Sequence, residues 1–201
     1  MPADLLFASL ASDFVELRES QALAIDLRYA SANNFIGHDL YGEFNKAFLH
    51  KIAAEKLEKA IQALQKINSK YRLIVFDALR PQSVQYVLWD KVKGTDQEQY
   101  VANPAIGSVH SFGFAVDVSI LNEAGQELDM GTPFDDFTPL AQPVLEEKFL
   151  TEGKLKDIHM RNRLLLRKVM QDATFIQLPL EWWHFDALPA AEVRAKYKIV
   201  E

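Results

Sequence analysis

The chain has 201 residues, a formal net charge of −6 and no cysteine. The lack of cysteine excludes disulfides and thiolate chemistry, and an acidic chain without a basic run argues against nucleic acid or an anionic membrane surface as a partner. No stretch of about 18 apolar residues is present, so we expect no transmembrane segment. The first ten residues are apolar but lack a basic region, so we expect no signal peptide and a cytoplasmic protein.

The N-terminal part is predicted to run from a lead-in to a strand and a loop. Residues 1–22 are expected to be irregular or a short helix, and residues 22–29 alternate apolar and polar side chains as a strand does. Residues 31–42 are rich in Asn, Gly and Asp, which is typical of a loop. Tyr29 leaves the strand into this loop and is therefore well placed to line a pocket.

The clearest predicted helix covers residues 45–68. Apolar side chains recur there at spacings of three and four, and lysines and glutamates fill the other face. Asn45 can act as its N-cap. We expect this helix to pack on the core, with His50 on its solvated side.

A strand followed by a second helix comes next. Residues 71–77 are β-branched and aromatic, and residues 82–92 have helical spacing. Pro81 is tolerated in the first turn of a helix. Arg80 therefore lies at a strand-to-helix corner, where it either serves a site or is a surface arginine paired with a carboxylate.

The second half is predicted to be mainly a β-meander. A loop over residues 94–107 leads into a bend at 111–113, and the tail from Ala190 is charged and needs no special role. The remaining expected elements are a strand at 114–120, a hairpin turn at 122–127 with a return strand at 128–130, a loop at 131–139, helices at 143–150 and 162–172, and strands at 174–177 and 182–185.

These elements together favour an α+β fold with a mostly antiparallel central sheet and helices packed outside it. The length allows one good core and is marginal for two domains. No repeat, low-complexity segment or interior linker divides the sequence. We therefore expect residues 1–201 to form a single domain, with a metal site at the sheet.

Three residues form the predicted metal site. His110 and Asp117 are seven residues apart, and a tight bend followed by a strand can bring both side chains toward one point. His184 lies far downstream. Two imidazoles and a carboxylate suit Zn²⁺, and three protein ligands with one open position are typical of catalytic rather than structural zinc. His38, His50 and His159 have no such spacing partner and are expected not to be ligands.

Two charged residues could complete the chemistry. Glu181, three residues before His184 and just after Pro179, could take a proton from the attacking water and hand it to the leaving amine. Arg80 could stabilise a developing oxyanion. Taken singly, His110 would more often be a hydrogen-bonded structural histidine and Glu181 a surface carboxylate.

These residues resemble a known family. The chain is similar to the zinc D-alanyl-D-alanine dipeptidases of the kind that serve vancomycin resistance, peptidase family M15, over about residues 22–186. The matching motifs are Ser108-x-His110-x-x-Gly113-x-Ala115-x-Asp117 and Glu181-Trp182-Trp183-His184, extended by Asp26 to Ala30, Asn33 to Phe35, Gly37, Asp77, Arg80-Pro81, Met130 to Thr132, Phe134-Asp135 and Asn162-Arg163.

The resemblance implies a role for each matched residue. Zinc would be held, one ion per chain, by His110, Asp117 and His184, with Glu181 as the base and Arg80 stabilising the tetrahedral intermediate. The substrate's carboxylate would be bound by Ser108, and its free ammonium by Tyr29 and Asp135. A small dipeptide such as D-Ala-D-Ala would then have both ends recognised, and longer peptides would be excluded.

The chain departs from the family pattern at two places. Ala78-Leu79 stands where a glycine and an aromatic residue are expected, and Phe112 and Phe114 flank Gly113 where smaller or polar residues are common. We expect the two phenylalanines to narrow or reshape the pocket. Two alternatives stay open: a peptidoglycan D,D-carboxypeptidase or endopeptidase, and a zinc-binding module without catalytic activity.

Overall fold

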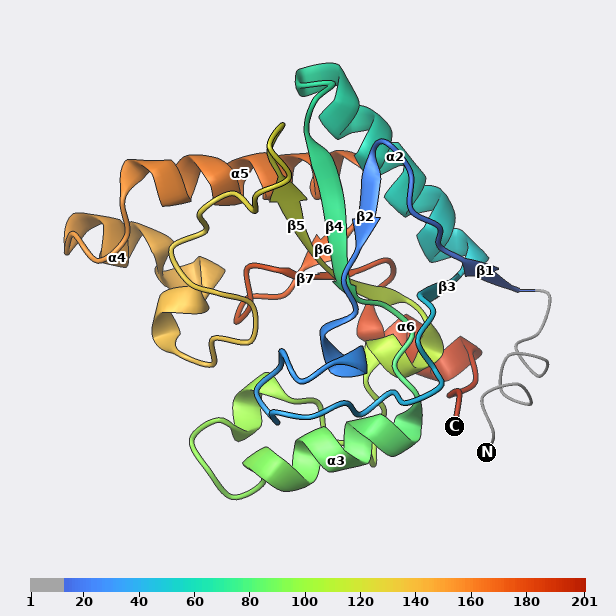
Figure 1. The fold of residues 1–201 in the computed structure, drawn as a ribbon. Helices are drawn as coiled ribbons and strands as arrows, with labels where there is room; N and C mark the ends of the chain where they lie inside the picture. Colours follow the sequence, from blue (N-terminus) through green and yellow to red (C-terminus); the bar gives the residue numbers. More distant parts are fainter. Residues whose placement is uncertain (1–12) are drawn as a thin grey trace.

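A five-stranded sheet is the centre of the structure, a computed structural model that describes residues 13–201 (Figure 1). β2 pairs parallel with β4, and the other three pairings are antiparallel, so the predicted mostly antiparallel α+β fold is confirmed. In spatial order the strands are β2 (Leu23–Ile25), β4 (Arg72–Asp77), β5 (Ala115–Leu121), β7 (His184–Asp186) and β6 (Ile176–Gln177).

A second, two-stranded sheet joins β1 (Phe14–Glu16) to β3 (Phe48–His50). β1 lies in the stretch predicted to be irregular or helical, so that prediction is wrong for these three residues. Residues 1–12, on which the rest of the lead-in and the absence of a signal peptide were predicted, lie outside the described residues.

The helices cover the sheet as expected for this fold class. α2 and α5 pack against each other, and α2 also contacts β4 while α5 contacts β6 (Figure 1). No helix in the described part of the chain is long and apolar enough to cross a bilayer. The helices are α2 (Lys51–Ile67), α3 (Gln82–Val92), α4 (Glu146–Thr151), α5 (Asp157–Asp172) and α6 (Ala190–Lys196).

The N-terminal end of α2 differs from the prediction. The helix begins at Lys51, not near Asn45, because the preceding three residues are drawn into the pairing with β1. His50 takes over as N-cap, since its Nδ1 accepts a hydrogen bond from the backbone N–H of Ile52 at 3.3 Å. His50 is buried and stacks on the ring of Phe114, so its predicted solvated position is wrong.

Residues 128–130 do not form the predicted return strand. The turn at 122–126 is present, but only an isolated bridge between Leu121 and Glu127 follows it. The next carbonyls bond to α5 instead: Asn162 Nδ2 donates to Asp129 O at 2.8 Å, and Arg163 Nε donates to Met130 O at 2.7 Å. Leu128 still donates to Ile120 O of β5, but Asp129 and Met130 are held by a helix rather than by the sheet edge.

The strand register aligns three polar residues across the sheet. Asp117 of β5 lies opposite Asp77 of β4 on one side and opposite His184 of β7 on the other. A row of buried polar side chains thus crosses three neighbouring strands at the end of the sheet where β4 ends and β5 begins. The smaller apolar cluster of Ala24, Ile74, Phe76 and Leu121 is separate from the main core.

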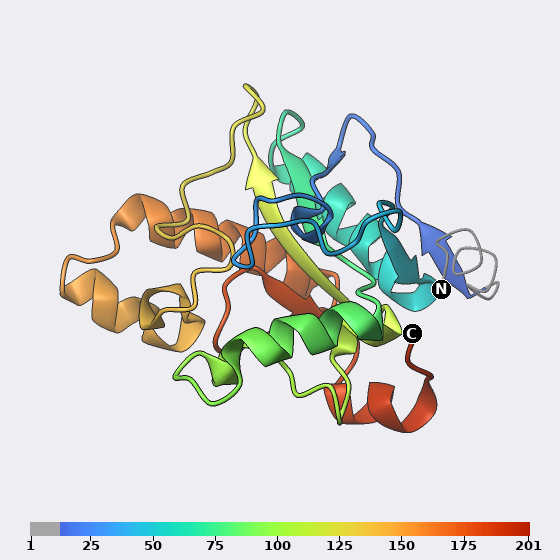
Figure 2. The ribbon, with the colours of Figure 1, turned by 60° about the horizontal axis from the view of Figure 1, so that its bottom comes forward.

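A tight turn adds a fourth side chain to this end of the sheet. His110 lies in a 3₁₀ helix, Val109–Phe112, that ends at Gly113 with φ +73°. A Cβ at Gly113 would lie 2.6 Å from a ring carbon of Phe14 and 3.0 Å from the backbone nitrogen of His50, so only glycine fits. α6 packs on the same 3₁₀ helix, and the C-terminus lies close by (Figure 2).

Candidate active site

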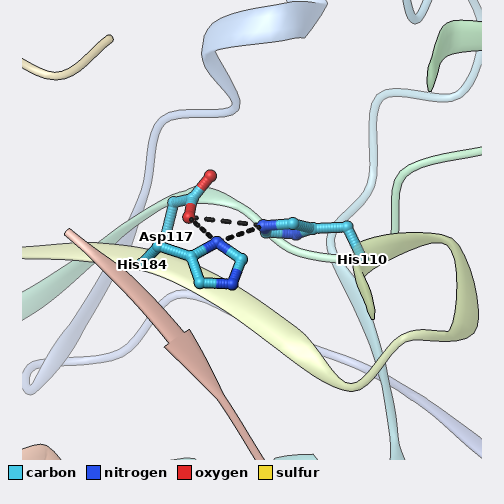
Figure 3. Close-up of side chains that lie close together, drawn as sticks. All are labelled: His110, Asp117 and His184. Carbon is cyan, nitrogen blue, oxygen red and sulfur yellow. Dashed lines mark hydrogen bonds and ion pairs between the residues drawn. The ribbon is translucent and has the colours of Figure 1, made fainter. Parts of the chain in front are cut away.

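His110, Asp117 and His184 converge on one point (Figure 3). His110 Nε2 lies 3.1 Å from His184 Nδ1 and 3.3 Å from Asp117 Oδ1, and the third distance, between His184 Nδ1 and Asp117 Oδ1, is 3.1 Å. All three residues are buried. The ligand atoms of a tetrahedral zinc site with bonds of about 2.0–2.1 Å are roughly 3.3 Å apart, so the cluster has the dimensions of a metal site.

The hydrogen bonds of the two imidazoles fix which nitrogen faces the cluster. His110 Nδ1–H donates to the Ala78 carbonyl at 2.7 Å, which leaves the lone pair of its Nε2 pointing inward. His184 Nε2–H donates to Asp186 Oδ1 at 2.8 Å, which leaves its Nδ1 inward. Three acceptor atoms then face one another, and a cation at their centre satisfies all of them. The cluster can therefore hold a metal ion.

Burial and neighbouring charges set the ionisation of the cluster. Without a metal, the inward nitrogens of His110 and His184 can take up protons instead; burial opposes the charged form of Asp117, but the charges of these histidines and their hydrogen bonds then hold the pKa of its carboxyl well below the usual range. Burial likewise opposes protonation of His184, but the carboxylates of Asp186 and Asp117 raise its pKa above the ordinary histidine value. The same carboxylates favour a metal cation in place of that proton.

Glu181 lies in the turn just before β7, beside the cluster. Its Oε2 is 3.9 Å from His184 Nδ1, and its side chain is buried. Burial raises the pKa of Glu181 to about 8, with further increases from the charges of Asp117 and Asp186 and opposing effects of His184 and Arg80. A carboxyl group poised near neutral pH can both accept and donate a proton, as general acid–base catalysis requires.

Arg80 is held beside the cluster by its neighbours. Its Nε and one terminal nitrogen donate to Asp77 Oδ2 at 2.8 and 2.6 Å, and Gln85 Oε1 accepts from the other terminal nitrogen at 2.9 Å. Its guanidinium also lies 3.6 Å from Asp117 Oδ2. Although burial opposes its charge, these carboxylates keep the pKa of Arg80 above its ordinary value. Arg80 is thus a fixed positive charge next to the three-ligand cluster, not a surface arginine.

Tyr29 and Asp135 form a pair in the same cavity. The Tyr29 hydroxyl donates to Asp135 Oδ1 at 3.1 Å, while Asp135 Oδ2 is buried without a hydrogen-bond partner. Burial and the charges of Asp117 and Glu181 raise the pKa of Asp135 well above the carboxyl range. An added cation would restore its charged form. The backbone of Asp135 has φ +59°, a conformation that L-residues rarely adopt.

These groups surround a cavity of about 140 Å³. Pockets for drug-sized ligands have about 300–1,000 Å³, so this one suits a small ligand. Phe112 and Phe114 do not line it; Phe114 stacks on His50, and Phe112 packs beside Gly107. Any effect of the two phenylalanines on the pocket is therefore indirect. The eight residues singled out from the sequence all line the cavity: Tyr29, Arg80, Ser108, His110, Asp117, Asp135, Glu181 and His184.

Several residues that line or support the cavity were not identified from the sequence. Asp186 orients His184, and its position two residues further along the same strand is a usable signal, because alternate strand residues share a face. Gln85 holds Arg80 from one turn into α3. Arg194 of α6 also lines the cavity, although the tail was predicted to have no special role.

A buried pair of histidines with one carboxylate, beside a second carboxyl group whose pKa burial raises to about 8, is the arrangement of a metal-dependent hydrolase. The chain belongs to the D-ala-D-ala dipeptidase family, Peptidase_M15, whose model matches residues 11–200, and it is thus a metallopeptidase.

The curated proteins that this chain resembles are named D-alanyl-D-alanine dipeptidase. A D-alanyl-D-alanine dipeptidase of Escherichia coli K12 is 36% identical over 169 residues, which cover 84% of this chain and 81% of the relative. Enzymes of the same name from Synechocystis and Enterococcus faecalis V583 are 28% and 27% identical, over 65% and 80% of this chain and 65% and 83% of theirs.

Proposed function

We propose that this chain hydrolyses the peptide bond of D-alanyl-D-alanine, or of a closely related D-containing dipeptide, with one Zn²⁺ ion held by His110, Asp117 and His184. The observation that carries the proposal is the position of the Glu181 carboxyl group, 3.9 Å from a ligand nitrogen of His184 inside a cavity of about 140 Å³. The shared name of the curated relatives supports the choice of substrate.

A zinc ion bound at this cluster would polarise the scissile carbonyl group and lower the pKa of water. Glu181 takes the proton of the attacking water and delivers it to the departing amine, a role that its buried position 3.9 Å from a ligand nitrogen permits. Arg80, fixed by Asp77 and Gln85, places positive charge where the carbonyl oxygen becomes negative. Because these partners hold Arg80 in place, little reorganisation accompanies the reaction.

Recognition of both substrate ends explains why a dipeptide would be preferred. The unpartnered Oδ2 of Asp135 and the Tyr29 hydroxyl suit the free ammonium group, and the raised pKa of Asp135 means that this carboxyl group gains from a cation. Ser108 is buried beside the metal-ligand turn, where its hydroxyl can donate to the substrate carboxylate. A blocked amino end would leave Asp135 without its cation.

Measurements of metal content and substrate range test the proposal. We expect close to one zinc per purified chain and release of D-alanine from D-Ala-D-Ala, with much weaker turnover of L-containing dipeptides. Efficient cleavage of a pentapeptide stem would favour a peptidoglycan carboxypeptidase or endopeptidase instead. Failure of the zinc-loaded protein to cleave any D-containing dipeptide would contradict the proposal. A cytoplasmic location stays a prediction, which cell fractionation would test.

A further inference from the structure

We infer that Arg194 of the C-terminal helix binds the carboxylate of the substrate and so helps to select peptides with a free C-terminal acid. This inference rests on the proposed dipeptidase function and adds a residue to it. Arg194 lines the cavity together with Ser108 and the metal-ligand cluster.

Arg194 is held in place next to Ser108. Its Nε donates to the backbone carbonyl of Gly107 at 3.1 Å, and Gly107 directly precedes Ser108 in the chain. The backbone at Gly107 is closely packed, because a Cβ there would lie 2.9 Å from the side chains of both Ile199 and Phe112. Val193, the neighbour of Arg194 on α6, is fully buried. Arg194 is exposed at the edge of the cavity; its guanidinium group is anchored at one nitrogen, and within residues 13–201 no hydrogen bond engages its terminal nitrogens.

The two arginines that line the cavity differ in their partners. Arg80 is paired with Asp77 and lies near Asp117. Arg194 takes part in none of the ion pairs found within residues 13–201, and its one hydrogen bond there is to a neutral carbonyl. Of these two cations, Arg194 is thus the one that pairs with no carboxylate in the described part of the chain.

The substrate needs such a group. A zwitterionic dipeptide brings one negative charge into a cavity already lined by the acidic residues Asp117, Asp135, Glu181 and Asp186. The hydroxyl group of Ser108 offers a hydrogen bond but no charge. A guanidinium group anchored beside it can pair with a carboxylate through its terminal nitrogens, which is the geometry that arginine provides.

The test compares an acid substrate with its amide. In metal-loaded wild-type protein we expect D-Ala-D-Ala to be hydrolysed with a higher kcat/KM than D-Ala-D-alaninamide. Arg194→Gln should raise the KM for the acid about tenfold, with little change in kcat and little change toward the amide. Arg194→Lys should retain part of the preference. Lys196→Gln is the matched control, because Lys196 lies on the same helix and pairs with Glu192 outside the cavity.

An acid-to-amide ratio that Arg194→Gln leaves unchanged would overturn the inference, as would equal losses toward both substrates. Calorimetric titration of the same two ligands into metal-loaded Glu181→Gln protein measures binding without turnover: Arg194→Gln should weaken binding of the acid and not of the amide. Binding of the acid by a wild type that cleaves neither substrate would contradict the proposed function alone. Binding of neither ligand would overturn both proposals.

Discussion

The two halves of the cavity are built differently. The metal-ligand half uses the buried side chains of His110, Asp117 and His184, and each histidine is fixed by a further hydrogen bond, to Ala78 O or Asp186. The half that we assign to the substrate ammonium uses Tyr29 from a short 3₁₀ helix and Asp135 from a loop. Asp135 has a positive φ and one buried oxygen without a partner.

This structural difference indicates that one half serves metal binding and the other serves substrate recognition. Ligands on paired strands and a tight turn, with the histidines held by second hydrogen bonds, keep a preformed geometry, which metal binding requires. A loop carboxylate with an unsatisfied oxygen remains incomplete until a cation reaches it. The metal-ligand half should therefore determine whether the reaction occurs, and the loop half should determine which molecule undergoes it. Changes in the two halves should give different kinetic signatures.

The largest effect is expected from the metal-ligand half. His184→Ala removes a ligand, so the protein should lose its zinc and its turnover should fall by at least about 10³-fold. Glu181→Ala should keep its zinc and lose about 10²–10⁴-fold in kcat, because only the proton transfer is removed. Metal analysis of dialysed protein, combined with D-alanine release, distinguishes the two variants. A Glu181→Ala protein without zinc would show that Glu181 belongs to the ligand set.

A second effect concerns the stability of metal-free protein. The pKa of Glu181 is raised from 4.5 to about 8 by folding, so between these values the folded state keeps a proton that the unfolded state has released. The free energy of unfolding should therefore fall as pH rises from 5 to 7, by on the order of 2 kcal/mol more in wild type than in Glu181→Gln. Urea unfolding of wild type and of Glu181→Gln at each pH, with a chelator present, measures this difference. Parallel pH profiles would contradict the buried state of this carboxyl group.

Substitutions in the half that we assign to the substrate ammonium should change substrate binding rather than the chemical step. Asp135→Asn keeps an acceptor for the Tyr29 hydroxyl but removes the charge, so the KM for D-Ala-D-Ala should rise about 10- to 100-fold with a smaller change in kcat. Asp136→Asn is the matched control, since its neighbouring carboxyl group does not line the cavity. Equal effects of the two substitutions on KM would remove Asp135 from substrate recognition.

The smallest effect is expected from Asp186, which contacts the candidate ligand His184. Asp186→Asn still offers an oxygen to His184 Nε2–H but no longer a charge, so zinc affinity should weaken about tenfold. Competition with a chromophoric chelator measures this change. Substrate KM at saturating zinc should stay near the wild-type value, and a large rise in KM would show that Asp186 acts on the substrate directly.

Much of the fold could be predicted because its signals are local. The strand over Arg72–Asp77 is a run of β-branched and aromatic residues, and Pro81 marks the beginning of the helix after it. The bend and strand around His110 and Asp117 were likewise readable from the sequence, because seven residues and a glycine suffice to place the two side chains.

The prediction failed where contacts between residues far apart in the sequence determine the local structure. Phe48–His50 continues the apolar spacing of the next helix, yet pairing with β1 makes it a strand. Residues 128–130 look like a hairpin partner, yet Asn162 and Arg163 of α5 hold their carbonyls. Arg194 reaches the cavity through a bond to Gly107, 87 residues earlier, which no local pattern encodes.

The row of Asp77, Asp117 and His184 across three strands has a consequence for assembly of the sheet. Side chains alternate along a strand, so a slip of one residue between β5 and either neighbour would turn Asp117 away from its partners. The native alignment brings the three candidate ligand atoms together, so a bound ion would favour it over a slipped arrangement. Metal binding would therefore stabilise the native strand alignment in addition to supplying the chemistry.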